Sequence, residues 1–278
     1  MKNLVIVMAG DKSLHRLYAQ NKSFELWVIY YGDNDVIFEE YKSTADRVWR
    51  AKGLKIELIR RVLLEQLYFA EKFDFEAYDF ILLPDDDIEF VGAADDISRL
   101  FEICAQIKAD VFQPAILNDF VSLAWESTKA IPGAFCHSTN IVEIMMHGFS
   151  GAAFTHAYLP AIHTMDFIRS GWGIEPIWKK IGEAHFRRSL NTFVIDAVSA
   201  LHTKPIGGGS AEIHAIGVME AVFVPQIHTN RMKTVTVYDN AAEIPLPSAP
   251  PPFAPILGNN YLQQCLDAGI ANIKRKEG

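Results

Sequence analysis

The amino-acid sequence predicts an α/β fold with a doubly wound, mainly parallel central sheet and helices on both faces. Short, continuous apolar runs of strand length alternate with longer segments of helical periodicity, which is the pattern of parallel sheets. Glycine or aspartate follows several of these runs, as expected where strands end. A length of 278 residues, 50% of them hydrophobic, suffices for one large core.

Five apolar runs predict strands. Runs without polar alternation are expected where helices cover both faces of a strand. The breaks after the first three runs fall on Gly10-Asp11, on Gly32-Asp33 and on a triplet of aspartates. The predicted strands are residues 4–9, 24–31, 78–83, 111–116 and 193–202.

Four segments predict helices. Residues 58–73 place Ile59, Val62 and Leu67 on one face, and residues 95–109 begin with acidic side chains, which suit a helix N-terminus. The other predicted helices are residues 151–170 and 177–186.

The pattern predicts one domain over residues 1–240 and a C-terminal arm over residues 241–278. Residues 244–255 hold six prolines, which exclude a helix or a central strand there. A short helix is expected over residues 261–273.

Charge and cysteine content narrow the class of protein. The net charge of −8 argues against a general affinity for nucleic acid or anionic membranes. The three cysteines are widely spaced and fit neither a disulfide framework nor a zinc site, which favours a cytoplasmic protein. The sequence has no signal-peptide pattern and no transmembrane run of about 18 apolar residues. If the protein contacts a membrane, we therefore expect it to associate with the membrane surface.

The triplet Asp85-Asp86-Asp87 follows a predicted buried strand. In doubly wound sheets, ligands bind beyond the carboxyl ends of strands. Carboxylates at Asp85 and Asp87 can hold Mn²⁺ or Mg²⁺ together with a diphosphate, and Asp86 is placed nearer the ribose or sugar of a donor. The alternative is a solvated acidic turn, which the position after a buried strand disfavours.

Further donor-binding residues are predicted at the same sheet edge. Gly10 and Asp11 follow the first strand, so they are expected to lie in the same crevice as the triplet. Lys52 is a candidate for a diphosphate, as is Lys55, although most such lysines are simply solvated.

A second constellation begins at His202, where the last predicted strand ends. His202 is predicted as a third metal ligand, oriented by Asp196 on the same face of the strand. Lys204 would meet a phosphate as a point charge, and three glycines at residues 207–209 would let the backbone approach closely. A half-buried histidine before a surface turn is an equally supported reading.

Two further segments predict sugar or acceptor contacts. Trp172, between two glycines, would offer an indole platform, and Glu175 would act as general base. A turn between helices, with Trp172 in the core, is the favoured alternative when this segment is taken alone. Polar residues in an apolar stretch, Glu143 and His147, followed by Ser150, would contact sugar hydroxyls or make ordinary buried hydrogen bonds.

The ordered set of these segments resembles domain-of-unknown-function family 707, whose members are regarded as glycosyltransferase-like. The resemblance spans residues 26–209. The residues that carry it are residues 78–88, Gln113-Pro114, residues 142–145, Phe149-Ser150, residues 171–174, residues 194–196 and His202 with its glycines.

The resemblance implies a GT-A-like (Rossmann-like) fold, with the triplet as an Asp-x-Asp metal motif. It implies a metal-dependent glycosyltransferase that moves a sugar from a nucleotide-diphosphate donor to a hydroxyl acceptor, either a glycan or a small molecule. The Gly-Trp-Gly-x-Glu run is similar to that of inverting β-1,4-galactosyltransferases, and His202-Thr-Lys204 is similar to a segment of retaining glycogenin-like enzymes. Two alternatives stay open: a non-catalytic nucleotide- or carbohydrate-binding protein, and a metal-dependent phosphoester hydrolase.

Overall fold

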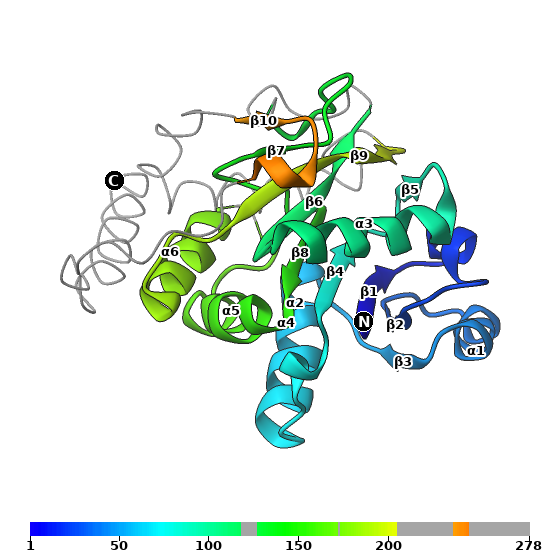
Figure 1. Cartoon of the computed structure of the whole chain (residues 1–278). Helices are drawn as coiled ribbons and strands as arrows, with labels where there is room; N and C mark the ends of the chain where they lie inside the picture. Colours follow the sequence, from blue (N-terminus) through cyan, green and yellow to red (C-terminus); the bar gives the residue numbers. More distant parts are fainter. Residues whose placement is uncertain (118–126, 172, 205–235, 245–278) are drawn as a thin grey trace, which may run out of the picture.

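A computed structural model describes residues 1–117, 127–171, 173–204 and 236–244 of the chain. Figure 1 shows a central twisted sheet with helices packed around it. The elements are β1 (Asn3–Ala9), η1 (Leu14–Tyr18), β2 (Glu25–Tyr30), α1 (Asp35–Thr44), β3 (Arg47–Arg50), α2 (Lys55–Ile59), η2 (Arg60–Ala70), η3 (Phe75–Ala77), β4 (Phe80–Pro84), β5 (Ile88–Phe90), α3 (Ala93–Ile107), β6 (Val111–Ile116), β7 (Cys136–Ser138), β8 (Met146–Ser150), α4 (Gly151–Ala153), η5 (Phe154–Tyr158), α5 (Leu159–Thr164), α6 (Glu175–Phe186), β9 (Thr192–His202), β10 (Val237–Tyr238) and η7 (Ala241–Glu243).

The described strands form one sheet in the order β10-β7-β9-β6-β8-β4-β1-β2-β3, with β5 paired to β9 outside that path. Neighbours are parallel from β3 through β2 and β1 to β4, and β6 is parallel to β9. Strand β8 is antiparallel to both β4 and β6, so the sheet is mixed beyond β4. The predicted doubly wound α/β fold is confirmed.

The continuous apolar runs arise because both faces of the sheet are buried. Along β1, Leu4 and Ile6 belong to one hydrophobic cluster, whereas Val5 and Val7 belong to the cluster on the other face. This alternation is the period of two that a strand imposes on its side chains. A strand covered on both sides therefore has apolar residues at every position.

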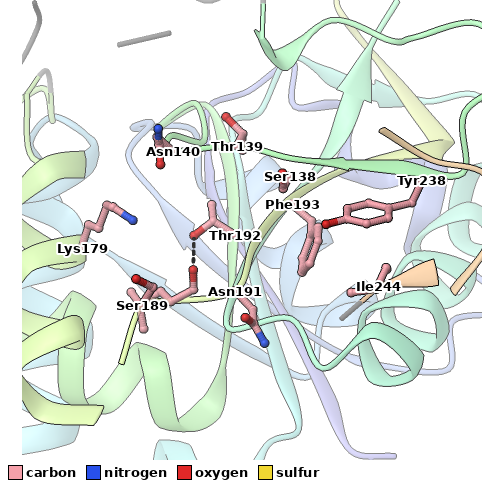
Figure 2. Close-up of a pocket in the computed structure, with 11 residues that line it drawn as sticks. Ser138, Thr139, Asn140, Lys179, Ser189, Asn191, Thr192, Phe193, Tyr238 and Ile244 are labelled. Carbon is pink, nitrogen blue, oxygen red and sulfur yellow. Dashed lines mark hydrogen bonds between the residues drawn. The ribbon is translucent and has the colours of Figure 1, made fainter. Parts of the chain in front are cut away.

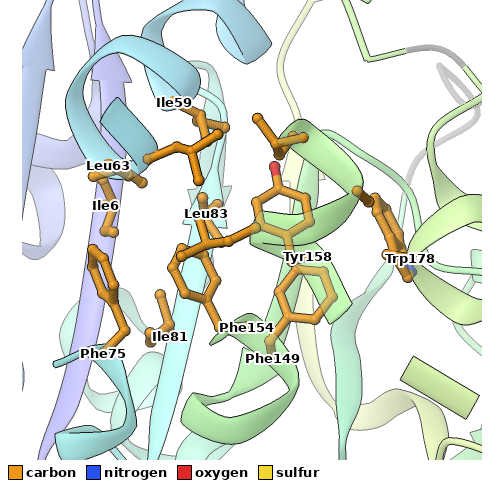
Figure 3. Close-up of a cluster of buried hydrophobic side chains, with 14 of the residues drawn as sticks. Ile6, Ile59, Leu63, Phe75, Ile81, Leu83, Phe149, Phe154, Tyr158 and Trp178 are labelled. Carbon is orange, nitrogen blue, oxygen red and sulfur yellow. The ribbon is translucent and has the colours of Figure 1, made fainter. Parts of the chain in front are cut away.

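Helices divide between the two clusters. Segments α2, η2, α4, η5, α5 and α6 contribute to the first cluster, and η1, α1 and α3 contribute to the second. Figure 3 shows Ile59 and Leu63 of the α2–η2 segment facing Ile6 and Leu83 of the sheet. None of the described helices is long and apolar enough to cross a membrane.

The helix expected over residues 58–73 begins at Lys55 and ends at Ala70. It begins earlier because the Glu57 carboxylate accepts a hydrogen bond from the backbone N–H of Leu54 (2.8 Å), which satisfies a donor at the helix start. It ends earlier because Lys72 has a positive φ of 55°, which a helix cannot continue through.

In the second half, the helical segment that begins at Gly151 ends at Thr164, and α6 begins at Glu175. Tyr238 and Ile244 pack against the second hydrophobic cluster, so the chain around the predicted domain boundary at residue 240 joins the main core. The expected proline-rich arm and short helix beyond residue 244 lie outside the described residues, as do the glycines at 207–209.

Strand direction decides which chain segments meet. Because β8 is antiparallel to both of its neighbours, β6 and β9 run in the same direction as β1, β2 and β4. The carboxyl ends of β4 and β9 therefore lie at the same edge of the sheet, and β5 joins them because Ile88 pairs with His202.

Truncation of Ile81 tests the double-sided burial. Ile81 is fully buried, so Ile81→Ala should lower the free energy of unfolding by about 2–5 kcal/mol, and Ile81→Val by about 1 kcal/mol. The matched control is Val36→Ala, at a residue with 76% exposure on α1, which should change it by less than about 0.5 kcal/mol. Urea unfolding measures all three, and equal losses at Ile81 and Val36 would contradict the described core.

Candidate functional site

The aspartate triplet, residues 85–87, forms the turn between β4 and β5 and is held by three distant segments. The N–H of Asp85 donates to the Met145 carbonyl (2.7 Å). The N–H of Leu14 donates to the second carbonyl of the triplet (2.7 Å), and the N–H of Thr203 donates to the third (3.0 Å). The turn is thus fixed from the β1, β8 and β9 sides at once.

Asp87 faces the end of β9. Its carboxylate lies 3.4 Å from His202 Nε2 and 3.6 Å from Lys204 Nζ. The side chains of Asp87 and His202 are 14% and 8% exposed, whereas that of Lys204 is 54% exposed. Burial alone would raise the pKa of Asp87, but the His202 hydrogen bond and the Lys204 charge outweigh it and lower that pKa.

Asp85 pairs with Lys55. Lys55 Nζ donates to Asp85 Oδ1 (2.6 Å) and to the carbonyls of Leu83 (3.0 Å) and Ile144 (2.6 Å). Burial lowers the pKa of Lys55, and the Asp85 carboxylate opposes that shift. The sequence does hold a signal for this role. A lysine at the first position of a helix is unfavourable to the helix dipole unless an anion faces it.

Asp86 binds the end of β1. Its Oδ2 accepts hydrogen bonds from the N–H of Gly10 (2.8 Å) and from the Tyr31 hydroxyl (2.7 Å). A Cβ at Gly10 would lie 2.7 Å from the Tyr31 hydroxyl oxygen, so a larger residue there would require the Tyr31 side chain to shift. The Gly10 N–H, predicted to contact a diphosphate, is engaged by Asp86.

Asp11 and Lys52 also have protein partners at this edge of the sheet. Asp11 Oδ1 accepts from the Tyr30 hydroxyl (2.5 Å). Lys52 Nζ lies 2.7 Å from Asp33 and donates to the Tyr31 carbonyl (2.6 Å) on an exposed rim.

His147, predicted to contact a sugar, has both ring nitrogens engaged inside the protein. Nδ1 lies 2.7 Å from the Ile144 carbonyl, which only accepts, so Nδ1 carries the proton. Burial, and then the charge of Lys55, keeps the pKa of His147 well below its usual value, so the ring is neutral. Nε2 therefore accepts from the Tyr158 hydroxyl (2.9 Å), and the ring stacks on Trp178. These contacts match the alternative of ordinary buried hydrogen bonds for His147.

Ser150 and Glu143 are placed by β8. Ser150 pairs with Phe80 at the start of β4, at the opposite edge of the sheet from the triplet, and its hydroxyl caps α4 by accepting from the Ala153 N–H (3.2 Å). The predicted sugar contact of Ser150 is therefore corrected. Glu143 precedes β8, is 4% exposed, and its N–H donates to the Gln113 side chain (2.6 Å).

The Gly-Trp-Gly turn packs near Lys55. Gly171 and Gly173 have φ values of 102° and 87°, which favour glycine. A Cβ at Gly171 would lie 2.9 Å from Ile144 and 3.0 Å from Ile56, so the turn approaches the segments that also hold Lys55. Trp172 lies outside the described residues.

Glu175 is the first residue of α6 and is 4% exposed. Burial, followed by the charges of Asp85 and Glu175, keeps the pKa of Tyr158 well above its usual value. The position of Glu175 matches the alternative reading of an acidic residue at a helix start.

Asp196 does not orient His202, contrary to the prediction. Its carboxylate lies 2.7 Å from His137 Nδ1 and accepts from the Ile131 N–H (2.7 Å). The reason is a register shift between β6 and β9. Pro114 pairs with Ile195, but the next residue of β6 pairs with Ser199, so simple alternation along β9 fails at Asp196.

The donor set of the triplet fits a divalent cation in part. Asp87 and His202 are adjacent and have the oxygen and nitrogen ligands that Mn²⁺ accepts. Asp85 Oδ1 is engaged by an ammonium group instead. Among the described residues, no cluster of three or more His, Cys, Asp or Glu side chains is arranged as a complete cation site. A cation here would take further ligands from a diphosphate or water.

A cavity of about 380 Å³ lies at the other end of β9, between β7, β10 and α6 (Figure 2). Of its described lining residues one is charged, Lys179, which pairs with Glu183 (2.9 Å). Thr192 at this end and His202 at the triplet are ten positions apart on one strand, so the two places are separated by roughly 30 Å. The cavity lacks the charges that a metal and a diphosphate require.

No protein-family model and no curated protein matches this sequence. Solved structures do match. The crystal structure of GalNAc-T7 with UDP, GalNAc and Mn²⁺ matches with a TM-score of 0.52 and 11% identity, over 82% of this chain and 48% of that chain. The structure of S. aureus TarS 1–349 has a TM-score of 0.47 and 14% identity, over 84% of this chain and 67% of that chain.

The likeness to GalNAc-T7 shows a shared GT-A fold, so the GT-A-like fold predicted from the sequence is confirmed. This chain spans about half the length of that structure's chain. A shared fold does not by itself fix the reaction, which depends on the residues at the site.

The hydrogen bond between Asp86 and Tyr31 predicts that substitutions at these two residues will not have additive effects on the free energy of unfolding. Tyr31→Phe should lower the free energy of unfolding by about 1 kcal/mol, and Asp86→Ala by about 2 kcal/mol, since Asp86→Ala also leaves the buried Gly10 N–H without its acceptor. The double variant should lose less than the sum, because both single changes break the same bond. Urea unfolding of the four proteins measures this, and strictly additive losses would contradict the contact.

The buried His15 predicts a pH dependence of stability. Burial, and then the Arg16 charge, lowers the pKa of His15 to about 4. The unfolded chain takes up a proton near pH 6.5, whereas the folded His15 does so only near its lowered pKa, so acid favours unfolding. Between pH 7 and pH 5 the free energy of unfolding should fall by about 2 kcal/mol through His15. His15→Gln should remove that part of the fall, whereas His163→Gln, at an exposed residue, should keep it. If the stability of His15→Gln varied with pH as that of the wild type does, the assignment to His15 would be wrong.

Proposed function

We propose that this chain is a metal-dependent glycosyltransferase that moves a sugar from a nucleotide-diphosphate donor to a hydroxyl acceptor. We further propose that the resemblance to family 707 reflects membership of that family. The observation that carries the proposal is the meeting of Asp87, His202 and Lys204 at the carboxyl edge of the sheet. That edge is where ligands bind in doubly wound folds.

The charges at this edge suit a metal–diphosphate complex. Asp87 and His202 would hold Mn²⁺ or Mg²⁺, and Lys204, which is half exposed beside them, would reach a phosphate oxygen. The metal would neutralise negative charge that develops on the leaving diphosphate. An overall charge of −8 makes these local cations necessary, since the protein as a whole repels a diphosphate.

Asp85 and Asp11 would offer hydrogen-bond acceptors at the same end of the sheet as the proposed cation site. The Asp85 side chain is 33% exposed, with Lys55 behind it, so its accessible oxygen can accept from a donor hydroxyl. Asp11 follows β1 and pairs with Tyr30 through one oxygen. Acceptors of this kind recognise the hydroxyl groups of a ribose or a sugar.

Glu175 remains the proposed base if the transfer inverts configuration. Its 4% exposure gives support to the alternative of a non-catalytic nucleotide- or carbohydrate-binding protein, because a base must reach the acceptor hydroxyl. The two functions differ in one result: a transferase consumes its donor in the presence of the right acceptor, and a binding protein does not.

A thermal-shift panel tests the proposal. Nucleoside diphosphates, starting with the UDP and Mn²⁺ present in the GalNAc-T7 structure, are added singly and together. One nucleotide with Mn²⁺ at 100-fold its Kd should stabilise the protein by about 2.7 kcal/mol and raise Tm by roughly 5 °C or more. EDTA should abolish that increase.

Asp87→Ala should remove the metal-dependent increase in Tm, because it removes one of the two proposed protein ligands. The matched control is Asp35→Ala, at an aspartate of 86% side-chain exposure that pairs with Arg50 on the surface, and it should leave the increase unchanged. Metal-dependent nucleotide binding that survives Asp87→Ala would refute the site. Donor breakdown that proceeds equally with and without any acceptor would favour the hydrolase instead.

A further inference from the structure

The Lys55 ammonium group occupies a cage of three oxygen atoms. Asp85 Oδ1 and the Ile144 carbonyl each lie 2.6 Å from Nζ, and the Leu83 carbonyl lies 3.0 Å from it. An ammonium group has three donors, and these three acceptors use all of them. One carboxylate and two backbone carbonyls are also the ligand types that a hard metal cation takes.

The cage is rigid because its oxygens belong to secondary structure or to a buried network. Leu83 lies in β4, where it pairs with His147 of β8. The Ile144 carbonyl also accepts from His147 Nδ1 (2.7 Å), and that ring is held in turn by Tyr158. The position of Nζ is thus set by groups other than Asp85, so it can impose an orientation on the Asp85 carboxylate.

The side chains of Lys55 and Asp85 differ in how far they are exposed to solvent. The Lys55 side chain is 10% exposed, whereas that of Asp85 is 33% exposed. The ammonium group is therefore the more deeply buried partner, and the carboxylate is the partner more open to solvent and ligands. A divalent cation beside Asp85 would be repelled by an ammonium group in contact with the same carboxylate.

We propose that Lys55 is a positioning residue that acts as a built-in cation. It orients the Asp85 carboxylate toward the ligand and fills a second cation position, so that one divalent ion binds, at Asp87 and His202. This inference rests on the proposed function for the identity of the ligand, but the cation count that it predicts is independent of any reaction.

Counting bound Mn²⁺ tests the proposal. Electron paramagnetic resonance of free Mn²⁺ gives the number of ions bound per chain, with Mn²⁺ alone and with UDP added. The wild-type chain should bind one ion. Lys55→Ala empties the oxygen cage and should raise the count to two, and Lys55→Ala with Asp85→Asn should return it to one, because the cage then lacks its charged ligand.

A matched control separates this effect from the loss of any lysine–aspartate pair. Lys22 pairs with Asp46 at 2.5 Å, and its side chain is 16% exposed, close to the values for Lys55. Asp46 accepts from Leu26 near the start of β2, at the edge of the sheet opposite the triplet. Lys22→Ala should therefore keep one bound ion and the affinity of the wild type for UDP.

Asp85→Asn alone keeps the test decisive if Lys55→Ala does not fold. If Asp85 is outside the metal shell, Asp85→Asn should change Mn²⁺ affinity less than about fivefold, whereas Asp87→Asn should weaken it more than about tenfold. A count of one in folded Lys55→Ala, or loss of the ion in Asp85→Asn, would overturn the inference. A wild-type chain that binds one Mn²⁺ but no nucleotide would refute the proposed function, and a count of two in Lys55→Ala would then still support the role of Lys55. A wild-type chain that binds no Mn²⁺ would overturn both.

Discussion

Three successive carboxylates at the end of a buried strand each need a different partner, and the site is organised around that constraint. Like charges this close repel, and partial burial penalises each of them. The turn at residues 85–87 resolves this by directing the side chains apart, toward Lys55, toward Gly10 and Tyr31, and toward His202 and Lys204. Cations and donors from the α2, β1–β2 and β9 regions are thus assembled around one turn.

The sheet makes this assembly possible. Strands β1, β2, β4 and β9 share a direction, so their carboxyl ends meet at one edge although β4 and β9 are far apart in the sequence. The pairing of Ile88 with His202 then joins the turn directly to the end of β9. Helices on both faces keep the strands buried and the edge fixed, which is why polar groups at the edge hold defined positions.

The three aspartates consequently differ in what they can do. Asp86 is committed to the structure, since its contacts tie β1 and β2 to the turn. Asp85 is oriented by the buried ammonium group of Lys55. Asp87 lies beside the His202 imidazole and the half-exposed Lys204. The GT-A fold is shared with GalNAc-T7, but a fold does not fix a reaction, and the proposed metal–diphosphate site depends on this division among the carboxylates.

The sequence by itself determined the buried strands β1, β2, β4, β6 and β9, the helical segments at α2–η2, α3 and α6, and the position of the triplet, because apolar periodicity reports burial and strand ends follow from it. It also indicated that His202 lies near the triplet. It did not predict α1, β3 or the antiparallel β8. Only the tertiary structure decided which partner each polar group takes. The antiparallel β8 carried Ser150 to the far edge, the register shift on β9 turned Asp196 to His137, and packing of α2 brought Lys55 to Asp85. Hydrogen-bond partners depend on register and packing between distant segments, and periodicity within one segment contains neither.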